Sequence, residues 1–240
     1  MTLSPPPGEP AAGPWRAVPL GEAVHVVTTA AGAPAGRPRV VAIDGRSGSG
    51  KSTLADRLHT AVPVSVVVHT DDVAWHQSFL DWVDLLATGV LEPVRRGQPV
   101  RYRPPAWDAR GRPGAIEVAA GLDMVLVEGV GAGRRELAHL VDAVVWVQSD
   151  PAEAERRGLD RDVASGADGD RDQAAAFWRE WMAEEVPFLE DQRPWERACV
   201  VVAGTPTVPH DPGQVVVAPP VPPGQPGSLP GEPRGSSVTD

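Results

Sequence analysis

Five short apolar runs organise the middle of the chain, at residues 40–43, 64–68, 124–127, 143–147 and 200–202. Runs this short, without strict alternation, are typical of strands buried on both faces of a parallel sheet. Between them lie segments with helical spacing, at residues 51–61, 79–87, 151–163 and 172–190. Strands that alternate with helices predict an α/β fold, a three-layer αβα sandwich around a mainly parallel sheet.

The two ends of the chain differ from this middle. Most of the 27 prolines lie near the ends. We expect residues 1–14 to be a disordered tail and residues 204–240 to be a Pro/Gly-rich tail, disordered from about Ala218. Residues 15–38 form an N-terminal extension and linker, in which residues 20–29 could be helix or strand. The predicted domain spans residues 39–203.

Composition excludes several classes of partner. Acidic residues outnumber basic ones by 32 to 22, and no dense Lys/Arg cluster is present, so we expect no nucleic acid. Cys199 is the only cysteine, which excludes an intrachain disulfide framework. No signal peptide and no apolar run of about 20 residues is found, so we expect a cytoplasmic protein without a membrane partner. The oligomeric state stays open.

One motif carries most of the chemical information. It reads Gly45-Arg46-Ser47-Gly48-Ser49-Gly50-Lys51-Ser52 and fits the phosphate-binding P-loop pattern at every fixed position. The glycines let backbone N–H groups approach phosphate oxygens, and the following helix N-terminus attracts the same anion. Lys51 is expected to reach the β- and γ-phosphates of ATP, and Ser52 to bind Mg²⁺. Thr53 completes the predicted binding set.

A Gly/Ser-rich linker is the alternative interpretation of this segment. Two observations favour the P-loop. The segment follows a predicted strand and precedes a predicted helix, which is the context that the motif requires. Lys51 is also the only lysine among the 22 basic residues, and it stands where a compact ammonium cannot be exchanged for a guanidinium.

Acidic side chains follow two other predicted strands. Asp71 and Asp72 come after residues 64–68, and Glu128 ends the run 124–127. Ligands of open α/β sheets bind at this edge, where a carboxylate can take the proton of an attacking hydroxyl or help to hold Mg²⁺. A helix N-cap or an ordinary loop acid remains the alternative for Asp71 or Asp72. Asp44 precedes the P-loop, and we interpret it as structural.

Arginines and aromatic residues could complete such a site. Arg157 and Arg161 are four residues apart on one predicted helix face, where they could clamp phosphate oxygens or form surface ion pairs. Trp107 falls in the segment on the acceptor side, where its ring could stack on a planar ligand or pack against the protein. Trp146, Trp178 and Trp181 are expected in the core. His69 and His76 are interpreted as structural.

Taken together, these motifs resemble the uridine kinase and phosphoribulokinase group of P-loop kinases over about residues 39–203. The resemblance implies the P-loop NTPase form of the αβα sandwich, with a helical lid that bears Arg157 and Arg161. It also implies that Asp71 activates the acceptor hydroxyl and that Asp81 binds the acceptor. Asp72 and Trp107 join Asp81 in the expected acceptor-binding set, and Glu128 joins Ser52 as a metal ligand.

The expected activity is transfer of the γ-phosphoryl group of ATP to a hydroxyl of a small molecule, with Lys51, Asp71, Arg157 and Arg161 as catalytic residues. The acceptor stays open, because residues 102–108 replace the Tyr-Asp-Phe and histidine segment of nucleoside kinases. A non-catalytic or regulatory ATP-binding protein is the alternative. A motor or GTPase is disfavoured, since one lysine cannot supply both the P-loop and an Asn-Lys-x-Asp motif.

Overall fold

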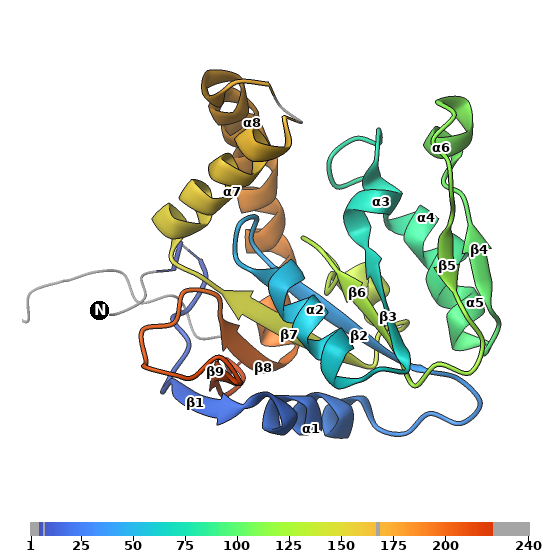
Figure 1. Cartoon of the computed structure of the whole chain (residues 1–240), viewed down its shortest axis with the longest axis horizontal. Helices are drawn as coiled ribbons and strands as arrows, with labels where there is room; N and C mark the ends of the chain where they lie inside the picture. The colour runs from blue at the N-terminus through green and yellow to red at the C-terminus, as the bar shows by residue number, and fades with distance from the viewer. Residues whose placement is uncertain (1–4, 7, 167–168, 223–240) are drawn as a thin grey trace, which may run out of the picture.

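The computed structural model describes residues 5–6, 8–166 and 169–222, and it forms a seven-stranded sheet with the order β1-β9-β8-β7-β2-β6-β3 (Figure 1). Its strands are β1 (Arg16–Pro19), β2 (Arg39–Gly45), β3 (Ser65–His69), β6 (Met124–Glu128), β7 (Ala143–Gln148), β8 (Ala198–Ala203) and β9 (Gln214–Ala218). The five strands from β8 to β3 run parallel, whereas β9 runs antiparallel to both of its neighbours, β8 and β1. The predicted α/β class and mainly parallel sheet are confirmed.

The helices lie on both faces of the sheet. They are α1 (Leu20–Ala31), α2 (Lys51–Ala61), α3 (Thr70–Ala74), α4 (Val83–Leu86), α5 (Glu92–Arg95), α6 (Pro105–Ala109), α7 (Pro151–Ser165) and α8 (Arg171–Gln192). A π-helical turn, Ala87–Leu91, joins α4 to α5, and 3₁₀ turns occur at Arg135–Leu137 and Pro194–Glu196. A small antiparallel sheet pairs β4 (Val100–Tyr102) with β5 (Ile116–Val118).

Alternation along the strands divides the core into two clusters. Val40 and Ala42 of β2 face a cluster that also contains Leu86 and Leu189, whereas Val41 and Ile43 face a cluster with Leu54 of α2. Because successive strand residues point to opposite faces, one buried apolar run supplies both layers. The predicted three-layer sandwich follows from this arrangement. No helix among the described residues is long and apolar enough to cross a membrane.

Two predicted boundaries are wrong. β9 pairs with β8 and β1, so residues 214–218 belong to the sheet and not to a tail. Residues 15–38 supply β1 and α1, which resolves the ambiguity of residues 20–29 in favour of a helix. In the predicted N-terminal tail, Glu9 is buried and only 4% exposed. The remaining parts of the predicted tails, at residues 1–4, 7 and 223–240, lie outside the described residues.

The helix expected at residues 79–87 lies further along the chain. Asp81 closes a turn by donating its backbone N–H to Ser78, and the helical segment then runs from α4 through the π turn to α5. Leu86, Val90 and Val94 bury its inner face, and this packing determines where the segment begins.

Candidate active site

The P-loop lies between β2 and α2, as expected from the sequence. Gly48 and Gly50 have φ values of 71° and 95°, in the left-handed region that favours glycine. A side chain at Gly48 would also clash with the carbonyl oxygen of Ala154. Gly50 is the N-cap of α2 and provides no capping side chain. The first N–H groups of α2 are therefore available to an anion.

Lys51 lies inside this loop. Its ammonium donates a hydrogen bond to the backbone oxygen of Arg46 over 3.1 Å, and the residue is only 8% exposed. The Arg46 side chain points away and donates to Glu9 over 2.9 Å. Of the predicted binding set, Arg46 can therefore offer its backbone but not its guanidinium.

Sheet order places the acidic residues beside the loop. β6 lies between β2 and β3, and its register pairs Glu128 with His69 of β3 and Ile43 of β2. Carboxyl ends of parallel strands share one edge, so Glu128 meets both the P-loop and the start of α3. Glu128 accepts hydrogen bonds from Ser52 over 3.1 Å and from the His69 ring over 2.7 Å.

This carboxylate is held in its charged form. Burial opposes ionisation of Glu128, but the His69 hydrogen bond and the nearby charge of Lys51 outweigh it and lower the pKa. The pKa of His69 is raised, chiefly by the same hydrogen bond. The hydroxyl of Ser52 and the carboxylate of Glu128 are the oxygen donors that Mg²⁺ prefers beside nucleotide phosphates, so the pair fits a magnesium ion.

Asp71, in the first turn of α3, lines the same cleft. Its side chain is exposed to water, although neighbouring protein atoms partly desolvate the carboxyl group. This partial desolvation raises its pKa, and the negative charge of Glu128 adds to the effect, whereas Lys51 and Arg161 oppose it. A carboxylate with a raised pKa is a stronger base than an ordinary aspartate.

The other predicted acceptor-binding residues do not line this cleft. Asp72 is paired with Arg112, and its backbone oxygen accepts the Trp107 indole N–H over 2.8 Å. Trp107 is 4% exposed, and the Arg112 guanidinium lies 3.8 Å from the centre of its ring. The expected stacking of Trp107 on a ligand is therefore wrong, because protein already covers the ring. Asp81 is exposed and is not among the residues that line the cleft.

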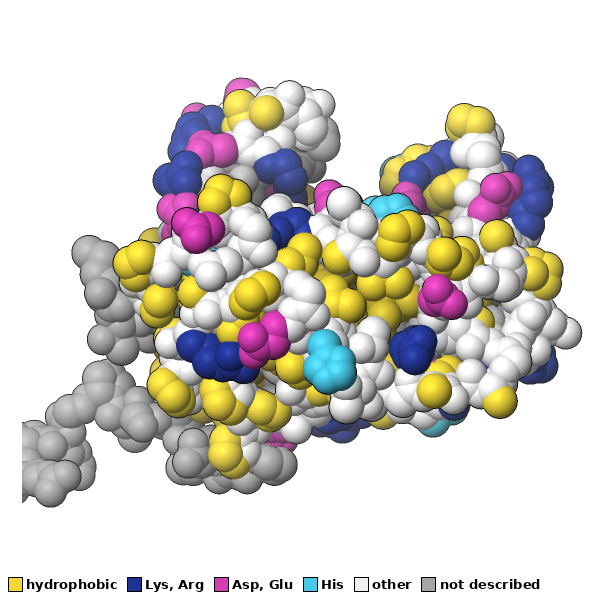
Figure 2. All heavy atoms as spheres, turned by 60° about the horizontal axis from the view of Figure 1, so that its bottom comes forward, with side chains coloured by type: hydrophobic (Ala, Val, Ile, Leu, Met, Phe, Trp, Pro, Cys, Tyr) yellow, Lys and Arg dark blue, Asp and Glu magenta, His cyan; other side chains and the backbone are white. Residues whose placement is uncertain are grey.

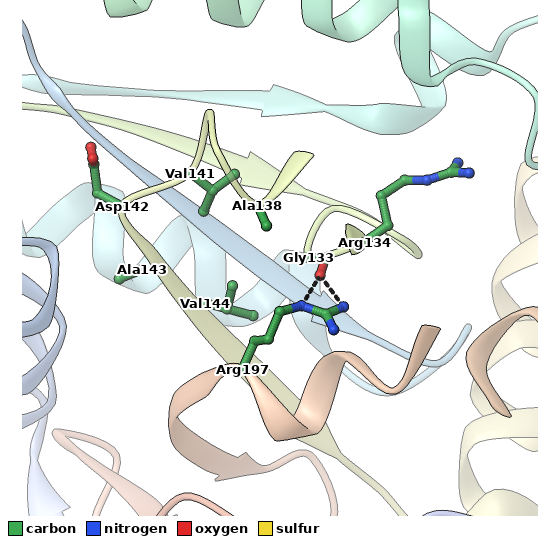
Figure 3. A pocket seen from close by; sticks show the side chains of 8 residues that line it. All are labelled: Gly133, Arg134, Ala138, Val141, Asp142, Ala143, Val144 and Arg197. Carbon is green, nitrogen blue, oxygen red and sulfur yellow. Dashed lines mark hydrogen bonds between the residues drawn. The ribbon is translucent and has the colours of Figure 1, made fainter. Parts of the chain in front are cut away.

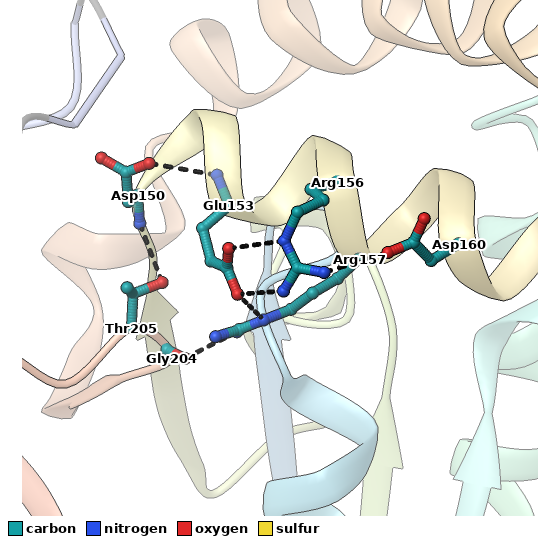
Figure 4. A network of polar contacts seen from close by, with 7 residues as sticks. All are labelled: Asp150, Glu153, Arg156, Arg157, Asp160, Gly204 and Thr205. Carbon is teal, nitrogen blue, oxygen red and sulfur yellow. Dashed lines mark hydrogen bonds and ion pairs between the residues drawn. The ribbon is translucent and has the colours of Figure 1, made fainter.

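The two lid arginines are separated by the structure. Arg161 lines the cleft and pairs with Asp162. Arg157 instead donates to Glu153 and to the backbone oxygen of Gly204, each over 2.8 Å (Figure 4). Residues four apart in a helix share a face only approximately. Because Arg157 and Arg161 therefore leave α7 in slightly different directions, they reach pockets on opposite sides of the P-loop.

The cleft has a volume of about 220 Å³. Its polar wall carries Ser47, Lys51, Ser52, Asp71, Glu128 and Arg161, and its apolar wall comes from α8 with Phe177, Trp178 and Trp181. Phe79 packs edge-on against Phe177 and Trp181, with ring centres 5.9 and 5.1 Å apart. Trp178 is buried as the sequence predicts, at 7% exposed, and Trp181 is partly buried against the core, yet both also line the cleft. Their helical spacing alone does not distinguish a core face from a cleft wall.

Two projections rise from the same end of the sheet, one formed by α7 and α8 and the other by α6 with β4 and β5 (Figure 1). The residues that line the cleft come in part from α7 and α8, through Arg161 and Phe177, and none comes from α6, β4 or β5. In the space-filling view, both projections carry basic and acidic side chains in mixed order (Figure 2). The α7–α8 projection carries Arg157 and Arg161, the two residues for which the resemblance implies a helical lid.

A second pocket, of about 320 Å³, adjoins the other side of the P-loop. Gly50 and Thr53 line it from the loop and α2, and Arg157, Gly204 and Pro206 close it from the lid and from the turn after β8. The two pockets therefore flank the N-terminus of α2, one on each side.

Asp44 has the structural role that the sequence suggested. Fully buried, it accepts backbone N–H groups from Gly45, Gly131 and Gly133. Burial raises its pKa to about 6, against the opposing effect of these hydrogen bonds. Arg197 donates twice to the Gly133 carbonyl from beside a separate cavity of about 150 Å³ (Figure 3). The loop after Glu128 is therefore fixed by Asp44, which accepts its N–H groups, and by Arg197, which donates to its carbonyl oxygen.

Comparison with known proteins shows the fold. No family model and no curated protein matches the chain. A candidate fructose transport system kinase from Silicibacter sp. TM1040 superposes with a TM-score of 0.52 at 21% identity, covering 75% of this chain and 95% of that chain. A candidate uridine kinase from Bacillus stearothermophilus gives a TM-score of 0.45 at 21% identity, covering 76% and 96%. The first of these two superpositions confirms the predicted resemblance at the level of the fold.

Proposed function

We propose that this chain is an ATP-dependent kinase that transfers the γ-phosphoryl group to a hydroxyl of a small molecule. One observation carries the proposal. A phosphate-binding loop, a magnesium-type oxygen pair and a carboxylate with a raised pKa converge on one cleft, through Lys51, Ser52, Glu128 and Asp71. Phosphoryl transfer needs these groups, because it proceeds by positioning and charge stabilisation rather than by covalent catalysis.

Each side of the P-loop has its own part in nucleotide binding. The backbone of residues 45–52 and the N-terminus of α2 hold the phosphates, and Lys51 reaches the γ-phosphate from inside the loop. Ser52 and Glu128 hold Mg²⁺, which supplies positive charge against the phosphate oxygens when bound. The pocket beside Thr53, Arg157 and Gly204 takes the base of the nucleotide, where the Arg157 guanidinium can stack on it.

Asp71 acts as the general base. It accepts the proton of the acceptor hydroxyl as the oxygen attacks the γ-phosphorus, and the bond to the ADP oxygen breaks. Lys51 and Arg161, the two cationic residues that line the cleft, stabilise the charge on the transferred group. Aromatic residues of α8 exclude water from this space and face the acceptor.

The raised pKa of Asp71 predicts the pH dependence of the reaction. The base must be deprotonated, so activity falls as pH drops through its pKa. Because that pKa lies above the ordinary value of 3.8, the acid limb of kcat/KM should also lie above 3.8. The measurement is a pH profile of kcat/KM for the acceptor, at saturating MgATP. An acid limb at or below 3.8 would contradict the assigned role.

The acceptor that we propose carries a flat apolar face, and a nucleoside is the leading candidate. Replacing Phe177, which is 38% exposed on the cleft wall, with alanine removes a stacking surface. A contact of this kind contributes about 0.5–1.5 kcal/mol, so KM for the acceptor should rise about 2- to 10-fold. The kcat and the KM for ATP should stay unchanged, as for loss of uniform binding.

Val163→Ala is the matched control for this variant. Val163 is equally exposed on α7 but does not line the cleft. Equal effects of the two substitutions on acceptor KM would remove the support for an apolar acceptor.

A direct assay tests the proposed function. The chain is incubated with MgATP and a panel of nucleosides, sugars and vitamins, and phosphorylated product is detected by mass spectrometry. Acceptor-dependent product is the expected result. Tight binding of MgATP without acceptor-dependent turnover would favour the alternative, a non-catalytic or regulatory ATP-binding protein. A cytoplasmic location, where ATP is abundant, forms part of the proposal.

A further inference from the structure

A short N-terminal arm, residues 8–15, runs beside the P-loop, although the sequence predicts a disordered tail there. Glu9 of this arm is 4% exposed, and its carboxylate accepts three hydrogen bonds. One oxygen accepts from the Trp146 indole over 2.7 Å and from Gln148 over 2.8 Å, and both of those residues belong to β7. The other oxygen accepts from Arg46 over 2.9 Å. The arm is thus anchored in the core by a charged group.

Arg46 is the second residue of the P-loop, and it is 6% exposed. Among the described residues, Glu9 is its only ion-pair partner, and one terminal nitrogen of the guanidinium has no hydrogen bond at all. The position of the buried Arg46 guanidinium therefore depends on the Glu9 carboxylate. The backbone oxygen of Arg46 also accepts a hydrogen bond from the Lys51 ammonium. The position of Arg46 therefore also fixes where the Lys51 ammonium lies before nucleotide binds.

A second buried carboxylate holds the next residue of the loop. Glu185 of α8 accepts the Ser47 backbone N–H over 3.0 Å and the Trp181 indole N–H over 2.7 Å. Two consecutive loop residues are therefore held by acids from two different elements, the arm and the lid helix. The arm also contacts the lid helix directly, since Gly8 lies against the side chain of Glu190.

We propose that Glu9 is a positioning residue for nucleotide binding, which holds the P-loop and Lys51 in their binding geometry through Arg46. A buried ion pair often adds little to the stability of the fold, because apolar residues of similar size in its place frequently give the same stability. What the pair supplies is one defined geometry for a loop whose glycines permit several. A loop ordered in advance loses less entropy when it binds phosphate.

The proposal rests on the proposed function only in requiring that the P-loop binds nucleotide, so its test needs no acceptor. The probe is MgADP, and its Kd is measured by calorimetry on the full chain. Glu9→Gln keeps the volume of the side chain and removes its charge. We expect the Kd to rise by about tenfold, within the usual range of coupling between sites. An unchanged Kd would overturn the proposal.

Two comparisons separate positioning from general support of the fold. Trp15→Phe loosens the packing of the arm, because Trp15 packs on the core but has no hydrogen bond to the loop. It should lower the thermal midpoint and leave the Kd unchanged. Glu9→Gln combined with Arg46→Met should bind MgADP no more weakly than Arg46→Met alone, because both changes break one contact. If the effects of Glu9→Gln and Arg46→Met on the Kd of MgADP were additive, or if Trp15→Phe and Glu9→Gln changed the Kd equally, Glu9 would only support the fold and the proposal would be overturned.

A measurement on the unaltered chain covers the case in which Glu9→Gln does not fold. Coupling is reciprocal, so MgADP must stabilise the arm if the arm positions the loop. Hydrogen exchange should slow in peptides that cover residues 8–15 as well as in those that cover 45–53. Protection of the P-loop without protection of the arm would overturn the proposal. Failure of the unaltered chain to bind MgADP would instead contradict the proposed function.

Discussion

Replacing Lys51 with methionine should lower kcat by about 10³-fold or more. The ammonium lies inside the P-loop, where it is shielded from water and can meet the charge that develops on the transferred phosphoryl group. Removing one such donor from a preorganised site costs about 10²–10³ in rate, and the loss of a full charge costs more. Steady-state kinetics with MgATP and the acceptor found in the panel measure the effect.

Lys51→Arg separates charge from shape. An arginine keeps the charge, but its planar fork does not fit a loop shaped around a compact ammonium, so most of the activity should be lost here too. Near-normal turnover in Lys51→Met, with an unchanged thermal midpoint, would contradict the proposed role of Lys51.

The single lysine permits a chemical test without mutation. An amine-specific reagent can modify only Lys51 and the chain's α-amino group. MgATP should protect Lys51 from modification while leaving the α-amino group reactive, as read by peptide mass spectrometry. Equal protection of both amines, or of neither, would place the nucleotide elsewhere.

Asp71→Asn should lower kcat by about 10²–10⁴-fold, the usual contribution of a general base. The amide keeps the shape of the side chain but cannot accept the proton of the acceptor hydroxyl. Binding of MgATP should change little, because the P-loop and the magnesium pair remain intact. The measurement is kcat for the acceptor, together with the Kd of MgADP.

The adjacent carboxylate supplies the matched control. Asp72 pairs with Arg112 and does not line the cleft, so Asp72→Asn should cost some stability and leave kcat within a few fold of the unaltered enzyme. If Asp72→Asn abolished turnover while Asp71→Asn retained it, the base would be assigned to the wrong residue.

Local patterns in the sequence were sufficient for the five parallel strands and the phosphate loop, although not for β1 and β9. The apolar runs at β2, β3, β6, β7 and β8 predicted a parallel sheet, because strands buried on both faces must be apolar throughout. The spacing of Gly45, Gly50, Lys51 and Ser52 predicted a loop between strand and helix, since the backbone geometry of that turn depends on adjacent residues only. The rule that parallel strands end at one edge placed Glu128 on the same edge as the loop. The strand order, in which β6 lies next to β2, then brings it beside the loop.

The sequence did not reveal which polar side chains face the site. Asp71 and Asp72 are neighbours with the same chemistry, yet one lines the cleft and the other pairs with Arg112, 40 residues away. The sequence left open whether Trp107 stacks on a ligand or packs against the protein, and it did not reveal that Trp181 also lines the cleft, because burial of an aromatic ring depends on which distant segment covers it. Composition also misjudged the arm, where buried hydrogen bonds from Arg46, Trp146 and Gln148 to Glu9 fix a segment rich in Pro and Gly.

The sequence by itself therefore determined the αβα architecture, the phosphate loop and the carboxylates available at the edge of the sheet. These features depend on local spacing and on the periodicity of strands and helices. The tertiary structure alone decided that Arg161 faces the cleft and Arg157 the second pocket, that α8 supplies an aromatic wall, and that Glu9 reaches Arg46. Those contacts join residues far apart in the chain, and their energies depend on burial that only the packed fold creates.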